Sequence, residues 1–112
     1  MIADTLYAKY ILERDGQNII EDGDGFIIYK VSGAECFIVE MFVNKEARRA
    51  GHGRSLIERL ASLVPECTIM TANIWPHKPG SSDALLGALR VGFEVKRADA
   101  GVLLIAKDLM EV

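Results

Sequence analysis

The chain has 112 residues, of which half are hydrophobic and about a quarter are charged. This composition predicts one folded domain, residues 1–112, rather than a disordered chain. The net charge of −3 gives no general attraction to nucleic acid, and the apolar runs are too short to span a bilayer. We therefore expect a soluble cytoplasmic protein that has no nucleic-acid or membrane partner and binds a small anion.

The chain begins with the pattern of an amphipathic helix. Asp4 or Thr5 can cap this helix, and it is expected to end near Gly16. The apolar stripe of the helix, which should pack on a sheet, comprises Leu6, Tyr7, Tyr10 and Ile11.

Three apolar segments follow, over residues 18–20, 26–31 and 36–43, and the short turns between them predict an antiparallel meander of strands. The first turn, EDGDG at residues 21–25, superficially resembles a calcium loop. It lacks the remaining ligand positions and the distal glutamate of such a loop, so we interpret it as a hairpin turn.

A strand, helix and strand then succeed one another. After a turn at 44–53, apolar residues recur at helical spacing as far as Pro65, and residues 68–75 have the pattern of a strand. A passage of this length usually forms a parallel pair. The helix is expected to bury Leu56, Ile57, Leu60, Ala61, Leu63 and Val64 and to leave Arg54, Glu58 and Arg59 in solvent.

The last part of the chain predicts a further helix and a closing hairpin. Ser82 or Asp83 can cap the helix and Gly92 closes it, while strands over 94–96 and 102–107 are joined across residues 98–101. The fold class is therefore α/β (α+β), with about six strands in a mixed, mostly antiparallel sheet and about three helices.

Two cysteines, Cys36 and Cys67, are too few and too poorly spaced for a disulfide framework or a zinc site. We interpret them as reduced, buried thiols that lie near each other at the starts of neighbouring strands. No metal site is expected.

The turn before the second predicted helix has the chemistry of an anion site. Arg48, Gly51 and Gly53 form an R-x-x-G-x-G pattern that ends where the helix begins. Glycines let main-chain N–H groups approach a phosphate closely, the helix dipole favours negative charge, and arginines add charge-assisted hydrogen bonds. An anionic cofactor such as one with a diphosphate is the expected ligand.

These residues resemble the GNAT acyltransferases, which use acetyl-CoA or a related thioester. In that family an alternating apolar strand is followed by R/Q-x-x-G-x-G/A and, later, by a helix that ends in G-F; here Gly92 and Phe93 match the second motif. The order of elements after residue 17 also matches, so the resemblance covers most of the chain. The pattern R-x-x-G-x-G alone is weak, because a basic glycine turn is usually only a solvated connection.

The resemblance implies an acetyl-CoA site in a cleft where the parallel strands that end at Val43 and Trp75 splay apart. In the family the main chain at Phe42 and Val43 binds the pantetheine arm, and Asn73 and Trp75 would border the cleft, unless they are only structural. The full set implied to bind the cofactor is Met41, Phe42, Val43, Arg48, Arg49, Ala50, Gly51, His52, Gly53, Arg54, Asn73 and Ser82.

A primary amine must lose its proton before it attacks a thioester, and an amine of pKa ~10.4 is only about one part in two thousand neutral at pH 7. Glu40 lies where the family often has an acidic residue, and its strand-face neighbours Ile38 and Phe42 are apolar, so it is a candidate base. Equally, Glu40 can be a strand residue that points to solvent.

The sequence departs from the family in its catalytic acid. The position of the usual tyrosine is Ala88, and all three tyrosines lie in the first third of the chain. His77 is a weak candidate to replace it, since a lone loop histidine is more often plain surface. We expect His52 to face solvent, and Ser81 or Ser82 either to contact the cofactor or only to cap the helix.

The chain is also short at its beginning, where the family has a strand and two helices. The acceptor side should therefore be open, which fits a large acceptor such as a protein amine, or a second copy of this chain that supplies the missing wall. Two functions follow. The chain is either an N-acyltransferase that moves an acetyl group from acetyl-CoA to a primary amine, or a silent relative that serves as a CoA binder or an assembly component, for instance in a phage particle.

Overall fold

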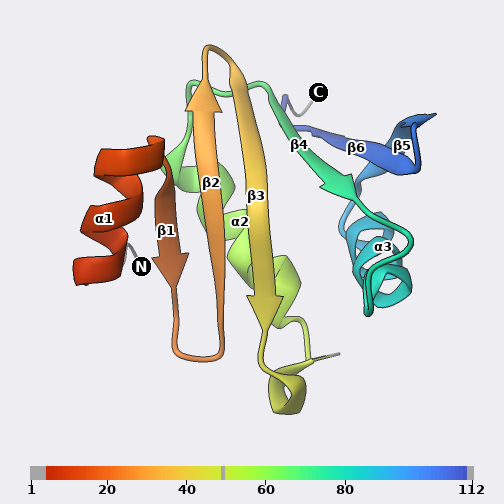
Figure 1. Ribbon diagram of the computed structural model, residues 1–112, viewed down its shortest axis with the longest axis horizontal. Helices are drawn as coiled ribbons and strands as arrows, with labels where there is room; N and C mark the ends of the chain where they lie inside the picture. Colours follow the sequence, from red (N-terminus) through yellow and green to blue (C-terminus); the bar gives the residue numbers. More distant parts are fainter. Residues whose placement is uncertain (1–4, 49, 111–112) are drawn as a thin grey trace.

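The computed structural model describes residues 5–48 and 50–110 (Figure 1). Three α-helices lie in this part of the chain: α1 (Leu6–Asp15), α2 (His52–Leu63) and α3 (Ser81–Arg90). A single 3-10 turn, η1 (Lys45–Ala47), precedes α2. The strands are β1 (Asn18–Glu21), β2 (Gly25–Ser32), β3 (Glu35–Val43), β4 (Ile69–Ile74), β5 (Glu94–Asp99) and β6 (Val102–Asp108). None of the described helices has both the length and the apolar character needed to cross a membrane.

The strands form one mixed sheet in the order β1-β2-β3-β4-β6-β5. Every neighbouring pair is antiparallel except β3 and β4, which run parallel because α2 returns the chain to the end of the sheet where β3 began. The predicted meander, the parallel pair and the closing hairpin are all confirmed.

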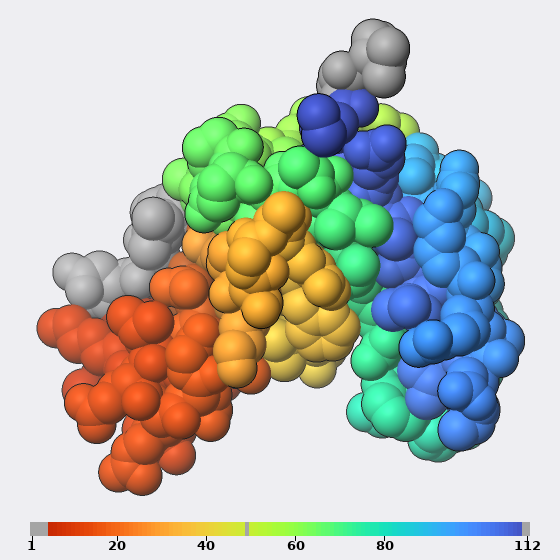
Figure 2. Space-filling view, turned by 90° about the horizontal axis from the view of Figure 1, so that it is seen from above, coloured from red at the N-terminus to blue at the C-terminus, as the bar shows by residue number. Residues whose placement is uncertain are grey.

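The parallel pair splays apart. Pairing between β3 and β4 runs from Glu35↔Ile69 only as far as Ile38↔Ala72, although both strands continue. In the pairing with β2, Val39 is one extra residue, because Ile28 lies opposite Glu40 while Tyr29 lies opposite Ile38. A β-bulge of this kind bends its strand, and β3 and β4 diverge beyond it (Figure 1). A notch consequently separates the half built from α1 to β3 from the half built from β4 to β6 (Figure 2).

The core lies between α2 and the sheet. Leu56, Ile57 and Leu60 of α2 are buried against the strands, and the apolar side of α3 joins the edge of the same cluster. On the opposite face α1 packs on β1 and β2 with a smaller cluster of Ile11, Ile19 and Ile28. Each layer therefore rests on the sheet, and the splay between β3 and β4 opens at one end of it.

The predicted apolar stripe of α1 is wrong for three of its four residues. Ile11 is buried, but Leu6, Tyr7 and Tyr10 are 84%, 54% and 54% exposed. A short helix that lies over the edge of a sheet makes a narrow contact, here through Ala8 and Ile11 one turn apart. The cap is Thr5, whose Oγ1 accepts the N–H of Ala8 at 3.0 Å, and Asp4 lies outside the described residues.

Two element ends also differ from the predictions. Helix α3 begins at Ser81 with Gly80 as its N-cap and without a side-chain cap, so neither Ser82 nor Asp83 caps it. The Ser81 hydroxyl instead donates to the carbonyl of Pro76 at 2.9 Å. The last hairpin turns at Ala100 and Gly101, which both have positive φ, so β5 continues to Asp99 rather than ending at Lys96.

Candidate functional site

The first turn of α2 presents main-chain N–H groups that have no partner within residues 5–48 and 50–110. Gly51 precedes the helix with φ +80°, a conformation that favours glycine, and no side chain caps it. The N–H groups of Gly51, His52 and Arg54 donate to no described residue. A Cβ placed on Gly51 would meet nothing within 4 Å. The predicted start of the helix is confirmed, and its open N–H groups suit a phosphate or diphosphate.

Arg48 lies against the end of β3. Its Nε donates to the carbonyl of Val43 at 2.9 Å, and its guanidinium carbon lies 5.7 Å from the centre of the Phe42 ring. The terminal guanidinium nitrogens donate to no described residue, so they can meet an anion while Nε holds the side chain in place. Arg49, the other predicted basic residue of this turn, lies outside the described residues.

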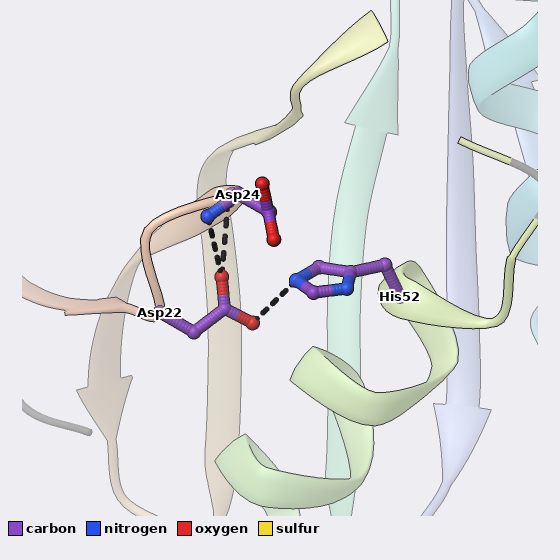
Figure 3. A network of polar contacts seen from close by, with 4 residues as sticks. Asp22, Asp24 and His52 are labelled. Atoms are coloured by element: carbon purple, nitrogen blue, oxygen red, sulfur yellow. Dashed lines mark hydrogen bonds and ion pairs between the residues drawn. The ribbon is translucent and has the colours of Figure 1, made fainter. Parts of the chain in front are cut away.

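We expected His52 to face solvent, but the structure turns its side chain toward Asp22. Its Nε2 lies 2.6 Å from Oδ2 of Asp22, a residue of the β1–β2 turn, and the His52 side chain is only 26% exposed (Figure 3). Asp22 was missed as a site residue, because 30 positions separate it from His52 and only the fold brings them together. The one local signal in the sequence that singles out Asp22 is its place as the first aspartate of the EDGDG turn. Its Oδ1 caps this turn by accepting the N–H groups of Asp24 and Gly25.

Asp22 makes the stability of the chain depend on pH. Partial burial raises its pKa, but the hydrogen bond to His52, the N–H groups of Asp24 and Gly25, and the charge of His52 outweigh that effect, so its pKa is lowered. A lowered pKa stabilises the folded state at pH values above the unfolded value of about 3.9. That stabilisation is lost as the pH falls through the folded pKa.

We expect urea unfolding between pH 3 and 6 to show this contribution as a difference between the wild type and Asp22→Asn. Above about pH 5 the free energy of unfolding of the wild type should exceed that of the variant by a constant amount. The difference should shrink below pH 4, and curves that stay parallel throughout would mean that Asp22 does not titrate in this way.

The end of α3 is fixed by two cations. Arg54, in the first turn of α2, donates to the carbonyl of Arg90 at 2.9 Å, and Lys107 of β6 donates to the carbonyl of Val91 at 2.6 Å. Gly92 follows with φ +104°, and a Cβ there would lie 2.7 Å from Nζ of Lys107. The G-F motif therefore has a structural reason in this chain, since Phe93 is also buried.

Gly92→Ala should destabilise the chain by about 1–3 kcal/mol, because alanine is strained at this φ and displaces Lys107 from its carbonyl. Thermal unfolding should show a melting temperature several degrees lower. Gly87→Ala, within α3, is the matched control, since nothing lies within 4 Å of a Cβ there, and it should be neutral or slightly stabilising. Equal melting temperatures for the two variants would contradict the strain at Gly92.

Glu40 is exposed on the half of β3 that does not pair with β4. We expected Ile38 and Phe42 to share its strand face, but the bulge at Val39 moves Ile38 to the α2 face, with Met41 and Val43. Glu40 lies opposite Ile28 and Phe42 opposite Phe26, on the face that carries α1. No described helix covers Glu40, so an acceptor can reach it from this side.

The other predicted residues border the splay from the side of β4 and α3. Asn73 is exposed on the part of β4 that does not pair with β3, and Trp75, 41% exposed, follows the strand. His77 is exposed beside Trp75, with ring centres 6.1 Å apart. Ser82 is exposed in the first turn of α3, whereas Ala88 is half-buried against the core.

The cysteines take no part in this site. Cys36 and Cys67 are both buried and free, and burial, followed by the neighbouring Cys67, raises the pKa of Cys36 to about 12. Within residues 5–48 and 50–110, no three His, Cys, Asp or Glu side chains gather as a metal site requires.

No protein-family model matches the sequence, and no curated protein matches it either. Solved structures do match. An acetyltransferase of the GNAT family from Bacteroides thetaiotaomicron has a TM-score of 0.66 and 19% identity, over 97% of this chain and 72% of its own. The PaiA N-acetyltransferase of Thermoplasma acidophilum, in complex with coenzyme A, has a TM-score of 0.67 and 15% identity, over 75% of this chain and 52% of its own.

An N-acetyltransferase from Escherichia coli that acts on an alanine of a ribosomal protein has a TM-score of 0.63 and 16% identity, over 97% of this chain and 79% of its own. At such identities the likeness is one of fold. The chain therefore has the fold of the GNAT N-acetyltransferases, and the resemblance seen in the sequence is confirmed at this level.

Proposed function

We propose that this chain is an acyl-CoA-dependent N-acyltransferase that moves an acetyl group from acetyl-CoA to a primary amine. The observation that carries the proposal is the start of α2, where the N–H groups of Gly51, His52 and Arg54 have no described partner and Gly53 lies against Met41 in the part of β3 that does not pair with β4. A diphosphate matches these N–H groups, the helix dipole and Arg48 in charge and geometry.

The proposed cofactor site has two walls. On one side lie Met41, Phe42 and Val43 of β3 and the turn residues from Arg48 to Arg54. On the other side lie Asn73 of β4 and Ser82 of α3. The carbonyl of Val43 already accepts from Arg48, but its second lone pair leaves room for one more donor. Arg54 has two roles in this proposal: it contacts the ligand, and its side chain donates to the carbonyl of Arg90 at the end of α3.

The proposed chemistry requires a base. Acetyl-CoA supplies a thioester whose thiol, with pKa near ~8.5, leaves readily. Glu40, directly or through a water molecule, takes the proton of the attacking amine. Ala88 offers no acid to the leaving thiolate, so this enzyme is slower than one with a tyrosine there, and His77 is the weaker candidate for that role.

The acceptor in this proposal is an amine on a large molecule. Val39, Glu40 and Phe42 are exposed, and no described helix covers this part of β3. An open face of this kind admits a protein amine, and a second copy of the chain is the alternative wall. The E. coli neighbour acts on a ribosomal protein, which is consistent with such an acceptor on this fold.

Thermal unfolding with and without acetyl-CoA tests the binding step. At a ligand concentration about 100 times the dissociation constant, binding adds ~2.7 kcal/mol, a shift of several degrees for a chain of this size. A thiol-release assay over a panel of amines and peptides then tests transfer. No thermal shift would contradict any CoA-dependent role, and a shift without thiol release would indicate a silent CoA binder.

A further inference from the structure

A polar network joins the β1–β2 turn to the first residue of α2 (Figure 3). Oδ1 of Asp22 accepts the N–H groups of Asp24 and Gly25 at 3.0 Å each. These two bonds fix the carboxylate so that its other oxygen, Oδ2, points at Nε2 of His52 at 2.6 Å. Both oxygens of the carboxylate are therefore engaged.

The pair is shielded from water. The side chain of Asp22 is 11% exposed, and Nε2 of His52 is buried, with the Asp22 carboxylate as the charged group that the structure places beside it. A buried polar atom that loses its partner is costly, so His52 has one favourable orientation, the one that meets Asp22.

Three further hydrogen bonds lie around the start of α2. The preceding turn is tied to the sheet by the N–H of Asn44 on the carbonyl of Asp24 at 2.6 Å and by Arg48 on the carbonyl of Val43. On the far side, Arg54 is bonded to the end of α3. The open N–H groups of α2 therefore lie between two braces, and Asp22 with His52 forms the brace on the side of β1 and β2.

Asp22 places a negative charge beside the first residue of α2. A carboxylate close to an anion site weakens anion binding by repulsion, so any benefit of Asp22 to that site must come through another residue. Hairpin capping alone needs only Oδ1, and the contact of Oδ2 with the helix that carries the anion site goes beyond that purpose.

We propose that Asp22 and His52 are positioning residues of the diphosphate site: Asp22 orients His52, and His52 fixes the first turn of α2 so that its N–H groups face the cleft. This inference rests on the proposed function. Neither residue touches the reacting atoms, so the pair should govern the affinity for CoA and the KM for acetyl-CoA, while kcat stays unchanged.

The test compares His52→Gln with His52→Leu in the full chain. Glutamine can place an N–H near the position of Nε2 and keep the bond to Asp22, whereas leucine has similar bulk and no donor. Calorimetric titration with CoA should give a Kd about tenfold higher for His52→Leu and within about twofold of the wild type for His52→Gln. The KM for acetyl-CoA should follow the Kd, with kcat equal in all three proteins.

A double-mutant cycle with Asp22→Ala checks that the two residues act together. If Asp22 acts through His52, the double variant binds CoA no more weakly than the weaker single variant. Wild-type affinity in His52→Leu, an equal loss in His52→Gln, or additive losses in the cycle would overturn the positioning role and leave the proposed function standing. Failure of the wild type to bind CoA would overturn both.

Discussion

Gly53→Leu should remove CoA binding while the chain stays folded. A Cβ on Gly53 would lie 3.5 Å from Cε of Met41, an ordinary contact, so the fold itself has room for a small side chain. Met41 belongs to the part of β3 beyond the splay, and a leucine directed there would fill the space that the proposed ligand needs. The stabilisation of ~2.7 kcal/mol expected at about 100 times the Kd should therefore vanish.

Gly87→Leu is the matched control for this experiment. Gly87 also lies within a helix, and nothing lies within 4 Å of a Cβ there. Both variants should have the circular dichroism spectrum of the wild type, and only Gly87→Leu should keep the thermal shift with acetyl-CoA. A full shift in Gly53→Leu would place the ligand elsewhere on the molecule.

Glu40→Gln should slow acyl transfer by ~10²-fold or more and leave CoA binding intact, because general base catalysis commonly contributes ~10²–10⁴ in rate. Glu40 lies one residue beyond the bulge and no described helix covers it, which gives an amine access from solvent. The measurements are thiol release at saturating acetyl-CoA and calorimetric titration of the variant with CoA.

Glu58→Gln controls for the loss of one negative charge. Glu58 is an exposed residue of α2, and it has no proposed role in the chemistry. It should transfer acetyl groups at the wild-type rate. If Glu40→Gln does so as well, Glu40 is only a surface residue. His77→Ala then tests the other catalytic candidate, His77, which was considered for the role of the acid.

The order of the elements could be predicted because it depends on local patterns. Alternation in residues 36–43, the helical spacing after residue 52 and the glycine turn between them each identify one element, and a strand, helix and strand passage fixes the parallel pair. The positive φ of Gly51 and the open first turn of α2 agree with the R-x-x-G-x-G pattern. This local signal was sufficient to predict the fold, and the anion site that it places at this turn stays a prediction.

The bulge at Val39 could not be predicted in the same way. A bulge depends on how a strand registers with its neighbour, and alternation along β3 alone continues without a break from Phe37 to Val43. Its consequence is large, because it reverses which residues of β3 face α2 and gives Glu40 a different set of neighbours.

The pairing of Asp22 with His52 escaped prediction for a related reason. Each residue has a sufficient local role, one in a hairpin turn and the other at a helix start, and only the packing of α2 on the sheet brings them together. The exposure of Tyr7 and Tyr10 likewise depends on where α1 lies on the sheet, which helical spacing does not specify.

The most direct measurement is a nuclear magnetic resonance titration of ¹⁵N-labelled protein with CoA that follows the main-chain amide signals of Gly51, His52, Gly53 and Arg54. We predict that these signals show the largest shifts and saturate at the Kd found by calorimetry. Amide signals at the start of α2 that stay in place while the protein binds CoA would contradict the assignment of this turn as the diphosphate site.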